Sequence, residues 1–298
     1  MRSDHLQPQN ENETIIAVEG IERELTLVHI TDSHIAAADS RDPQALETAL
    51  RYQQLFQERT PGNVPAAQLF QEALERSDNL GADCTVLTGD ITHLPTFAGL
   101  EIIERAVHSL QGEYLYTLGN HDWHFHHLPW NDETRLQHYP RFAHLTGGNP
   151  AAQVIELAGM RLIALDNSNY QVTPDQLDFL RRQLQTGEPC LLFLHIPLSI
   201  PSLVPAVVEK WQAPIVMAAD GWTEETREKW QVRDDDESTT ACHQLLTGGE
   251  ADNLVGIFCG HVHFAHADQV HPGCFQYVTR PGFEGCQRVI KIRAQIEE

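Results

Sequence analysis

Short, nearly continuous apolar runs are the feature that most constrains the fold of this 298-residue chain. Runs of this length are typical of strands buried on both faces, and segments with helical spacing separate many of them. Strands that alternate with helices, followed by a strand-rich C-terminal part, predict a layered α/β sandwich. The predicted strands are LTLVHI (25–30), CTVLTG (84–89), YLYTLG (114–119), QVIELA (153–158), RLIALD (161–166), CLLFLHI (190–196), LVGIFCG (254–260), HADQV (266–270), FQYVT (275–279) and RVIKI (288–292).

Helical spacing marks five segments, and one of them carries clear end signals. Thr173 is a good N-cap, Pro174 suits the first turn, and leucines form one apolar stripe along the helix that follows. Near the N-terminus, TIIAV (14–18) followed by Glu-Gly predicts an edge hairpin with the strand at 25–30. The predicted helices are 43–59, 65–79, 95–109, 174–185 and 239–247.

One segment, at about residues 197–238, lacks clear periodicity. It contains four prolines, three tryptophans and the acidic run 234–237. This composition predicts an insertion that lies over the core as a cap or loop. The acidic run is expected to be a solvated loop.

Charge and composition exclude several classes of partner. The chain has 20 Lys and Arg against 42 Asp and Glu, so its formal charge of −22 repels nucleic acid and anionic membranes. The N-terminal residues lack the apolar core of a signal peptide, and no apolar run has the roughly 18 residues of a membrane span. We therefore expect a cytoplasmic protein whose six cysteines, which form no CxxC pair, are mostly buried reduced thiols.

Five of the apolar runs stop in Asp, Asn or His, the side chains that offer oxygen and imidazole nitrogen to metal ions. The five corners are HITDSHI, LTGDITH, TLGNHDW, FLHIPLS and FCGHVHF. Each corner alone has an ordinary explanation, because Gly, Asn and Asp are common in turns and a single His is often only hydrogen-bonded. Five of them in one chain predict a site for two metal ions.

Simple geometry supports this prediction. In an extended strand, residues i and i+2 point to the same face, so Asp32 and His34 are expected to reach one ion together. The two carboxylate oxygens of Asp90 can bridge two ions. His195 closes a buried strand, and His261 and His263 leave another strand in the GHVH motif and can serve neighbouring ions.

The ordered motifs D-x-H, GD, GNHD, H and GHxH resemble those of the calcineurin-like metallophosphoesterases, from Asp32 to His263. The resemblance implies a four-layer α/β/β/α sandwich of two mixed sheets flanked by helices, with residues 1–298 as one domain. It implies that one metal is held by Asp32, His34, Asp90 and His263, and that the second is held by Asp90, Asn120, His195 and His261.

The resemblance also implies a mechanism. Two divalent or trivalent ions, drawn from Mn, Fe, Zn or Ni, would lower the pKa of a shared water and stabilise an in-line displacement at phosphorus. His121 would contact the phosphate and protonate the leaving oxygen, with Asn120 also near the substrate. Asp122 is expected either to orient His121 or to cap the turn. His124 either lines the substrate cleft or is a loop histidine without a partner.

These features favour a phosphoesterase that acts on a phosphodiester or phosphomonoester, loosely like the class III cyclic nucleotide phosphodiesterases. Purple acid phosphatases carry a metal-bound tyrosine where this chain has His93, so a tyrosinate iron centre is not expected. The predicted partner is a small phosphorylated substrate, with nucleotides among the candidates, and neither nucleic acid nor a membrane is expected. The alternative is a catalytically silent scaffold of the same fold that binds a partner protein. The sequence does not give the oligomeric state.

Overall fold

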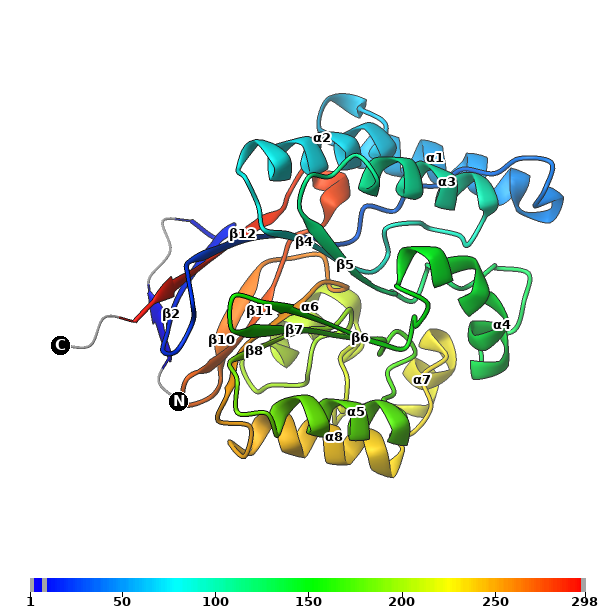
Figure 1. The fold of residues 1–298 in the computed structure, drawn as a ribbon. Helices are drawn as coiled ribbons and strands as arrows, with labels where there is room; N and C mark the ends of the chain where they lie inside the picture. The colour runs from blue at the N-terminus through cyan, green and yellow to red at the C-terminus, as the bar shows by residue number, and fades with distance from the viewer. Residues whose placement is uncertain (1–2, 7–9, 296–298) are drawn as a thin grey trace.

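The computed structural model describes residues 3–6 and 10–295, and their strands form two six-stranded mixed sheets that pack face to face (Figure 1). The strand orders are β1-β2-β12-β3-β4-β5 in the first sheet and β10-β11-β9-β8-β7-β6 in the second. The first sheet contains β1 (Ser3–Leu6), β2 (Glu13–Val18), β12 (Arg288–Ala294), β3 (Leu25–Ile30), β4 (Cys84–Thr88) and β5 (Glu113–Thr117). The second contains β10 (His266–His271), β11 (Cys274–Val278), β9 (Leu254–Cys259), β8 (Cys190–Phe193), β7 (Met160–Leu165) and β6 (Ala152–Leu157).

Helices cover the outer faces of both sheets, so the predicted four-layer α/β/β/α sandwich is confirmed (Figure 1). The first sheet is covered by α1 (Leu46–Arg59), α2 (Ala66–Asn79) and α3 (Phe97–Val107), and the second by α5 (Pro174–Leu184) and α8 (Glu237–Thr247). The other helices are α4 (Asp132–Phe142), α6 (Val204–Trp211) and α7 (Glu224–Trp230), with short 3-10 turns at Pro43–Ala45, Pro61–Asn63, Ala143–Leu145 and Gly282–Glu284.

The apolar runs are nearly continuous because both faces of the central strands are buried. In β7, Leu162 and Ala164 pack between the two sheets, whereas Ile163 and Leu165 face the core under α5 and α8. The same alternation in β3 places Leu27 between the sheets and Val28 under α1–α3. The period of two along each strand therefore supplies all three apolar layers.

The helix from Thr173 has the predicted ends. The Thr173 hydroxyl accepts a hydrogen bond from the Gln176 N–H, and the Gln176 side chain accepts one from the Thr173 N–H, which is a capping box. Leu177 and Leu180 are buried and Leu184 packs against the same core. Within the described residues all six cysteines are free, five of them buried and Cys286 half-buried.

The predicted hairpin between residues 14–18 and 25–30 is wrong. The strand β2 pairs in parallel with β12 and antiparallel with β1, so β12 lies between β2 and β3. A local turn signal favoured the hairpin, but a strand from the far end of the chain takes the position beside β3. The helical pattern also missed α4, α6 and α7, which are short or interrupted by proline.

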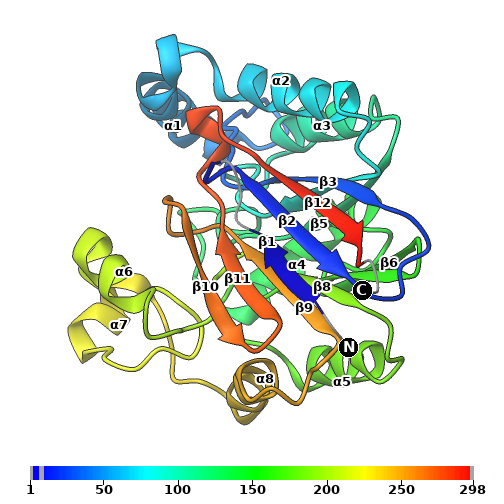
Figure 2. The ribbon, with the colours of Figure 1, turned by 90° about the vertical axis from the view of Figure 1, so that its left-hand side faces the viewer.

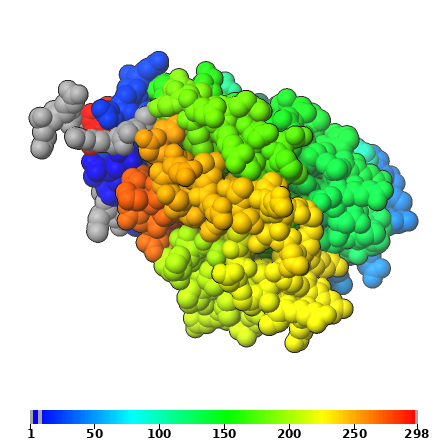
Figure 3. Space-filling model, turned by 90° about the horizontal axis from the view of Figure 1, so that it is seen from below, coloured from blue at the N-terminus to red at the C-terminus, as the bar shows by residue number. Residues whose placement is uncertain are grey.

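The segment at about 197–238 contains α6 and α7, which lie together beside the second sheet (Figure 2). In the view from below, this segment forms the yellow-green and yellow surface next to α8 (Figure 3). Among the residues that the structure describes, no helix combines the length and the apolar character needed to cross a bilayer.

Candidate metal centre

Strand ends from both sheets deliver the predicted ligands to one place. In the first sheet, the neighbouring strands β3, β4 and β5 run parallel, as do β8 and β9 in the second. Each of these strands is followed within three residues by a predicted ligand. These ligands are Asp32, Asp90, Asn120, His195 and His261. Carboxyl ends of parallel strands share one edge of a sheet, so five corners far apart in sequence become neighbours.

The first ligand group consists of Asp32, His34 and His263, whose donor atoms all lie within 4.8 Å of one another. Nε2 of His263 is 3.1 Å from Oδ1 of Asp32 and 3.2 Å from Nε2 of His34. Two imidazoles and one carboxylate with converging donor atoms can hold one transition-metal ion.

The second group consists of Asp90, His195 and His261, again with donor atoms within 4.8 Å. Nε2 of His195 is 3.3 Å from Oδ2 of Asp90 and 3.1 Å from Oδ1 of Asn120, so the amide oxygen joins this group. Oδ2 of Asp90 is also 3.8 Å from Nε2 of His34 in the first group. Asp90 therefore lies between the two groups, where a bridging carboxylate belongs.

The backbone at these ligands is unusual. Five of the seven have positive φ angles of 49° to 69°, in the left-handed region that few residues other than Gly adopt and in which Asn, Asp and His are the commonest of those few. The five are Asp32, His34, Asp90, His261 and His263. The expected geometric reason for pairing Asp32 with His34 is therefore wrong. Both lie beyond the end of β3, and left-handed corners rather than an extended strand bring them together. Strain of this kind is typical of functional sites.

Two of the motif glycines are required by close approach. A Cβ atom on Gly119 would lie 2.3 Å from Oδ1 of Asp90, and one on Gly260 would lie 1.9 Å from Oγ1 of Thr31 and 2.4 Å from Oδ2 of Asp32. A side chain at either position would push a ligand carboxylate away. The glycines of GNH and GHVH thus let the corners from different strands touch.

Hydrogen bonds outside the ligand groups fix the imidazole rings. Nδ1–H of His195 donates to the carbonyl oxygen of Thr88 at 2.7 Å, so Nε2 is the ring nitrogen that faces Asp90 and would bind an ion in exchange for its proton. Nδ1 of His34 is 3.1 Å from Nδ1 of His93, so Nε2 of His34 faces the first group. Such contacts set the tautomer and orientation of metal ligands.

The electrostatics favour positive charge between the groups. Burial disfavours the imidazolium of His195, but Asp90 and Asp32 outweigh it and raise its pKa to about 9. Burial also opposes ionisation of Asp32, yet the charges of His263 and His195 hold the pKa of that carboxyl below its usual range. Burial opposes ionisation of Asp90 as well, but the charges of His195 and His121 hold its pKa well below the usual range, so both carboxylates stay ionised where cations would bind. The mixed oxygen and nitrogen donor set fits Mn, Fe, Zn or Ni.

His121 lies against this centre without joining either group of converging carboxylate and imidazole donors described above. Its backbone N–H donates to Oδ1 of Asp90 at 2.7 Å, and its ring stacks on that of His93 with centroids 4.2 Å apart. Burial lowers the pKa of His121, against the charge of Asp90, which raises it. A phosphate anion bound beside the ring would favour the protonated form.

Asp122 braces two of the corners. Oδ2 accepts from the N–H groups of Gly119 at 2.7 Å and Asp90 at 2.8 Å, and Oδ1 accepts from Thr92 N–H and the Tyr116 hydroxyl. Burial and the charge of Asp90 raise the pKa of Asp122 to about 8. These contacts support the turn-capping interpretation, and none of the described hydrogen bonds of Asp122 reaches the His121 ring.

Two of the three histidines that follow GNHD, His124 and His126, differ in their surroundings. Nε2–H of His124 donates to the Leu128 carbonyl at 3.0 Å, and the ring packs against Trp130. The ring of His126 is instead 6.4 Å from that of His121 and 5.6 Å from that of His93. Of the two, His126 is the one placed beside the predicted acid.

The 197–238 segment reaches the centre from the other side. Nζ of Lys210 donates to the carbonyl oxygen of His263 at 2.5 Å, and Nε1–H of Trp211 donates to that of Val262 at 2.9 Å. The Trp211 ring is 5.5 Å from the ring of His263. This places the segment predicted as a cap beside the first ligand group.

One polar residue that supports the predicted ligands was not expected from the sequence. Asn167 is fully buried after β7, and its Oδ1 accepts from the backbone N–H groups of His195 at 3.2 Å and Ile196 at 3.1 Å. Its position directly after an apolar strand was the one indication in the sequence, and the residues DNSN are equally typical of an ordinary turn.

Comparisons with known proteins agree with this geometry. Residues 25–265 match the family model described as calcineurin-like phosphoesterase. A dimetal phosphatase from Danio rerio has a similar structure, with 14% identity, a TM-score of 0.51 and coverage of 87% of this chain and 88% of that one. The purple acid phosphatase PPD1 from yellow lupin (Lupinus luteus) seeds is also similar, with 12% identity, a TM-score of 0.53 and coverage of 96% of this chain and 48% of that one. No curated protein sequence matches the chain.

Proposed function

We propose that this chain, which belongs to the calcineurin-like phosphoesterase family, hydrolyses a phosphodiester or phosphomonoester at a centre that holds two metal ions. One observation carries the proposal: two groups of converging ligand atoms meet at Asp90, and a further histidine lies beside them. When bound, two such ions activate water and offset the charge that develops on a phosphate. The rest of the chemistry belongs to the side chains.

Asn120 keeps the centre attractive to an anion. Two divalent ions bring about +4 and the carboxylates of Asp32 and Asp90 bring −2, so a neutral amide as the remaining oxygen ligand preserves a net positive charge. The chain as a whole carries −22 and repels phosphate at a distance. Local positive charge therefore has to come from the ions and from cationic groups beside them, such as the ammonium of Lys210.

His121 is the proposed proton donor to the leaving oxygen. Its backbone is held by Asp90 and its ring by stacking on His93, so the imidazole is positioned before substrate binds. No carboxylate among the described residues is hydrogen-bonded to the His121 ring. The negative charge of Asp90 raises the pKa of His121, and a bound phosphate would raise this pKa further.

The substrate is proposed to be a small phosphorylated molecule, with nucleotides among the candidates. His126, Lys210 and Trp211 stand beside the centre and offer imidazole, ammonium and aromatic surface to such a molecule. A cytoplasmic location and the absence of a nucleic-acid partner stay predictions. All seven ligand positions and His121 are present, which argues against the silent scaffold, because a silent relative is expected to lose some of them.

A substrate panel tests the proposal. Protein reconstituted with Mn²⁺ is assayed on para-nitrophenyl phosphate, its bis ester, cyclic nucleotides and nucleotide pyrophosphates. His121→Ala should lower turnover on the preferred substrate by roughly 10²- to 10⁴-fold while leaving the bound metal unchanged. His127→Ala, an exposed histidine of the same loop, is the matched control and should be fully active. Absence of turnover on the whole panel would contradict the proposal.

A further inference from the structure

The loop between β7 and α5, residues 166–173, is polar yet largely buried, and the proposed chemistry does not use it. Its tyrosine, Tyr170, is 3% exposed and points its hydroxyl at a ligand of the second group: the oxygen is 3.0 Å from Nε2 of His261. We propose that Tyr170 is a positioning residue for the second metal ion. It accepts a hydrogen bond from Nε2–H of His261 and so reserves Nδ1 for the ion.

The geometry supports this role because an imidazole ligand needs one nitrogen free and the other protonated. His261 has a donor atom within 4.8 Å of those of Asp90 and His195. If Nε2–H is engaged by the tyrosine oxygen, the neutral ring presents its lone pair at Nδ1. The two rings meet nearly at right angles, at 81°, with centroids 5.6 Å apart, so a hydrogen bond rather than stacking joins them.

The loop is built to hold the tyrosine in place. Tyr170 has φ +68°, a strained left-handed conformation for a bulky side chain that persists only where the surroundings enforce it. Its N–H donates to the carbonyl of Asn167 at 2.8 Å, and the side chain of Asn167 binds the backbone of His195. One loop therefore contacts two ligands of the same group, His195 through an amide and His261 through a hydroxyl.

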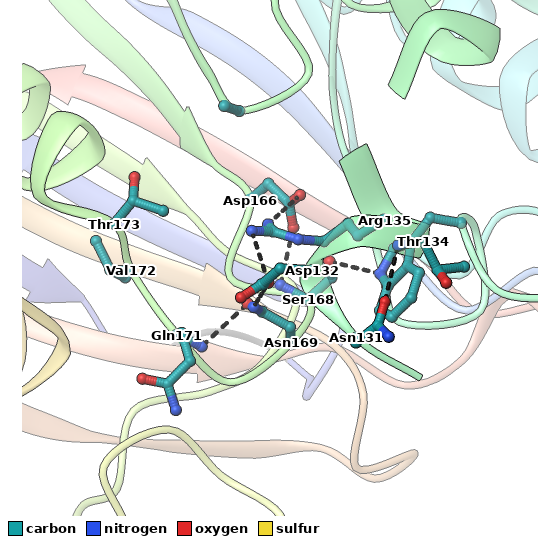
Figure 4. A network of polar contacts seen from close by, with 12 residues as sticks. Asn131, Asp132, Thr134, Arg135, Asp166, Ser168, Asn169, Gln171, Val172 and Thr173 are labelled. Atoms are coloured by element: carbon teal, nitrogen blue, oxygen red, sulfur yellow. Dashed lines mark hydrogen bonds and ion pairs between the residues drawn. The ribbon is translucent and has the colours of Figure 1, made fainter. Parts of the chain in front are cut away.

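A polar network anchors this loop to α4 (Figure 4). The carboxylate of Asp166 accepts from Arg135 at 3.0 Å and from Ser168 N–H at 2.8 Å, and Asn169 donates to Asp132 at 2.5 Å. These anchors precede the strained residue in the chain, and after it the Val172 N–H donates to the Thr239 hydroxyl at 2.9 Å. They explain how a left-handed tyrosine is maintained next to the centre.

The experiment uses a matched pair of tyrosines. Tyr170→Phe removes only the hydroxyl at His261. Tyr277→Phe removes the hydroxyl of another buried tyrosine, 6% exposed, which contacts His5 2.6 Å away and outside both ligand groups. Mn²⁺ binding to metal-free protein is measured by calorimetry and by the electron paramagnetic resonance signal of the free ion.

Tyr170→Phe should weaken one of the two Mn²⁺ binding steps by roughly 10- to 100-fold, as loss of a hydrogen bond to a metal ligand usually does, and Tyr277→Phe should change neither step. In a His261→Ala background, Tyr170→Phe should have no further effect, because its partner is gone. Equal affinities in Tyr170→Phe and the parent protein, or equal weakening with and without His261, would overturn the proposal.

A second measurement separates positioning from direct ligation. A visible charge-transfer band in the Fe³⁺-loaded protein that disappears in Tyr170→Phe would place the tyrosine oxygen on the metal and overturn the positioning role. The inference rests on the proposed function only for the presence of metal ions. Because metal binding is the readout, a failed substrate panel would leave this test intact.

Discussion

Replacing Arg135 by Met should destabilise the protein strongly, because the guanidinium compensates a buried charge. Arg135 is 3% exposed and Asp166 is 0% exposed, and their side chains are 3.0 Å apart (Figure 4). Without the arginine, the hydrogen-bond donors that remain for the Asp166 carboxylate among the described residues are the Tyr139 hydroxyl and the Ser168 N–H. Removing one partner of a buried ion pair typically costs about 3–5 kcal/mol, since the other charge is left uncompensated.

The expected size follows from burial rather than from the number of contacts. In bulk water the same pair would contribute well under about 1 kcal/mol, as exposed pairs do. The exposed pair Arg181–Asp178, with side chains 47% and 62% exposed, provides that comparison within the same protein. Arg181→Met should therefore change the free energy of unfolding by less than about 0.5 kcal/mol.

The assay is urea unfolding of metal-free protein in EDTA, followed by tryptophan fluorescence, so that metal affinity does not enter the free energy. A double variant, Arg135→Met with Asp166→Asn, removes both charges and should recover a large part of the loss. A loss of unfolding free energy below about 1 kcal/mol in Arg135→Met would refute the reasoning. A double variant whose loss exceeds the sum of the losses in the two single variants would also refute it.

Three further predictions concern the centre and its surroundings. Asn120→Asp should keep or tighten Mn²⁺ binding but weaken inhibition by phosphate roughly a hundredfold. The reason is that one added negative charge about 5 Å from the phosphate costs about 3 kcal/mol at an effective dielectric of about 20. Equal inhibition of both proteins would contradict the charge argument. Burial lowers the pKa of His29 from 6.5 to about 3, so the unfolded chain binds a proton that the folded one does not, and stability falls as pH drops below 6.5. From pH 7 to pH 5 this histidine should cost about 2 kcal/mol of unfolding free energy, a slope that His29→Gln should lose. Saturation with Mn²⁺ at about 100 times the dissociation constant should stabilise the fold by roughly 2.7 kcal/mol per site over EDTA, and unchanged melting temperatures would argue against metal binding.

The sequence was sufficient for what depends on local pattern. Burial on both faces gave the central strands their continuous apolar runs, so β3, β4, β8 and β9 were found within a few residues of their ends. Capping chemistry found α5 for a similar reason. The position of β12 between β2 and β3 depends on contacts between the two ends of the chain, and no local signal reports those.

The residues that support the ligands were harder to predict than the ligands. Asp32 and His261 belong to short motifs whose composition is unusual in itself. Tyr170 and Asn167 lie about 90 and 30 residues from the histidines that they contact, in a sequence that resembles a common turn. Their role depends on which strands become neighbours, so it appears only once the two sheets are assembled.

The GNHD corner shows how turn chemistry and ligand chemistry depend on each other. Gly119 allows the backbone of the turn to approach Asp90. The Asp122 carboxylate then accepts hydrogen bonds from the N–H groups of Gly119 and Asp90, so the turn also fixes the position of the predicted bridging carboxylate. In the same turn, the side chain of Asn120 faces the second group, and the ring of His121 stacks on the ring of His93 beside it. A neutral oxygen at 120 lets the turn deliver a ligand without adding a third negative charge to a centre that has to attract phosphate. The same four residues therefore satisfy the backbone hydrogen bonds of the turn and set the net charge of the site. The Asn120→Asp substitution separates these two roles, because it preserves the turn and changes only the charge.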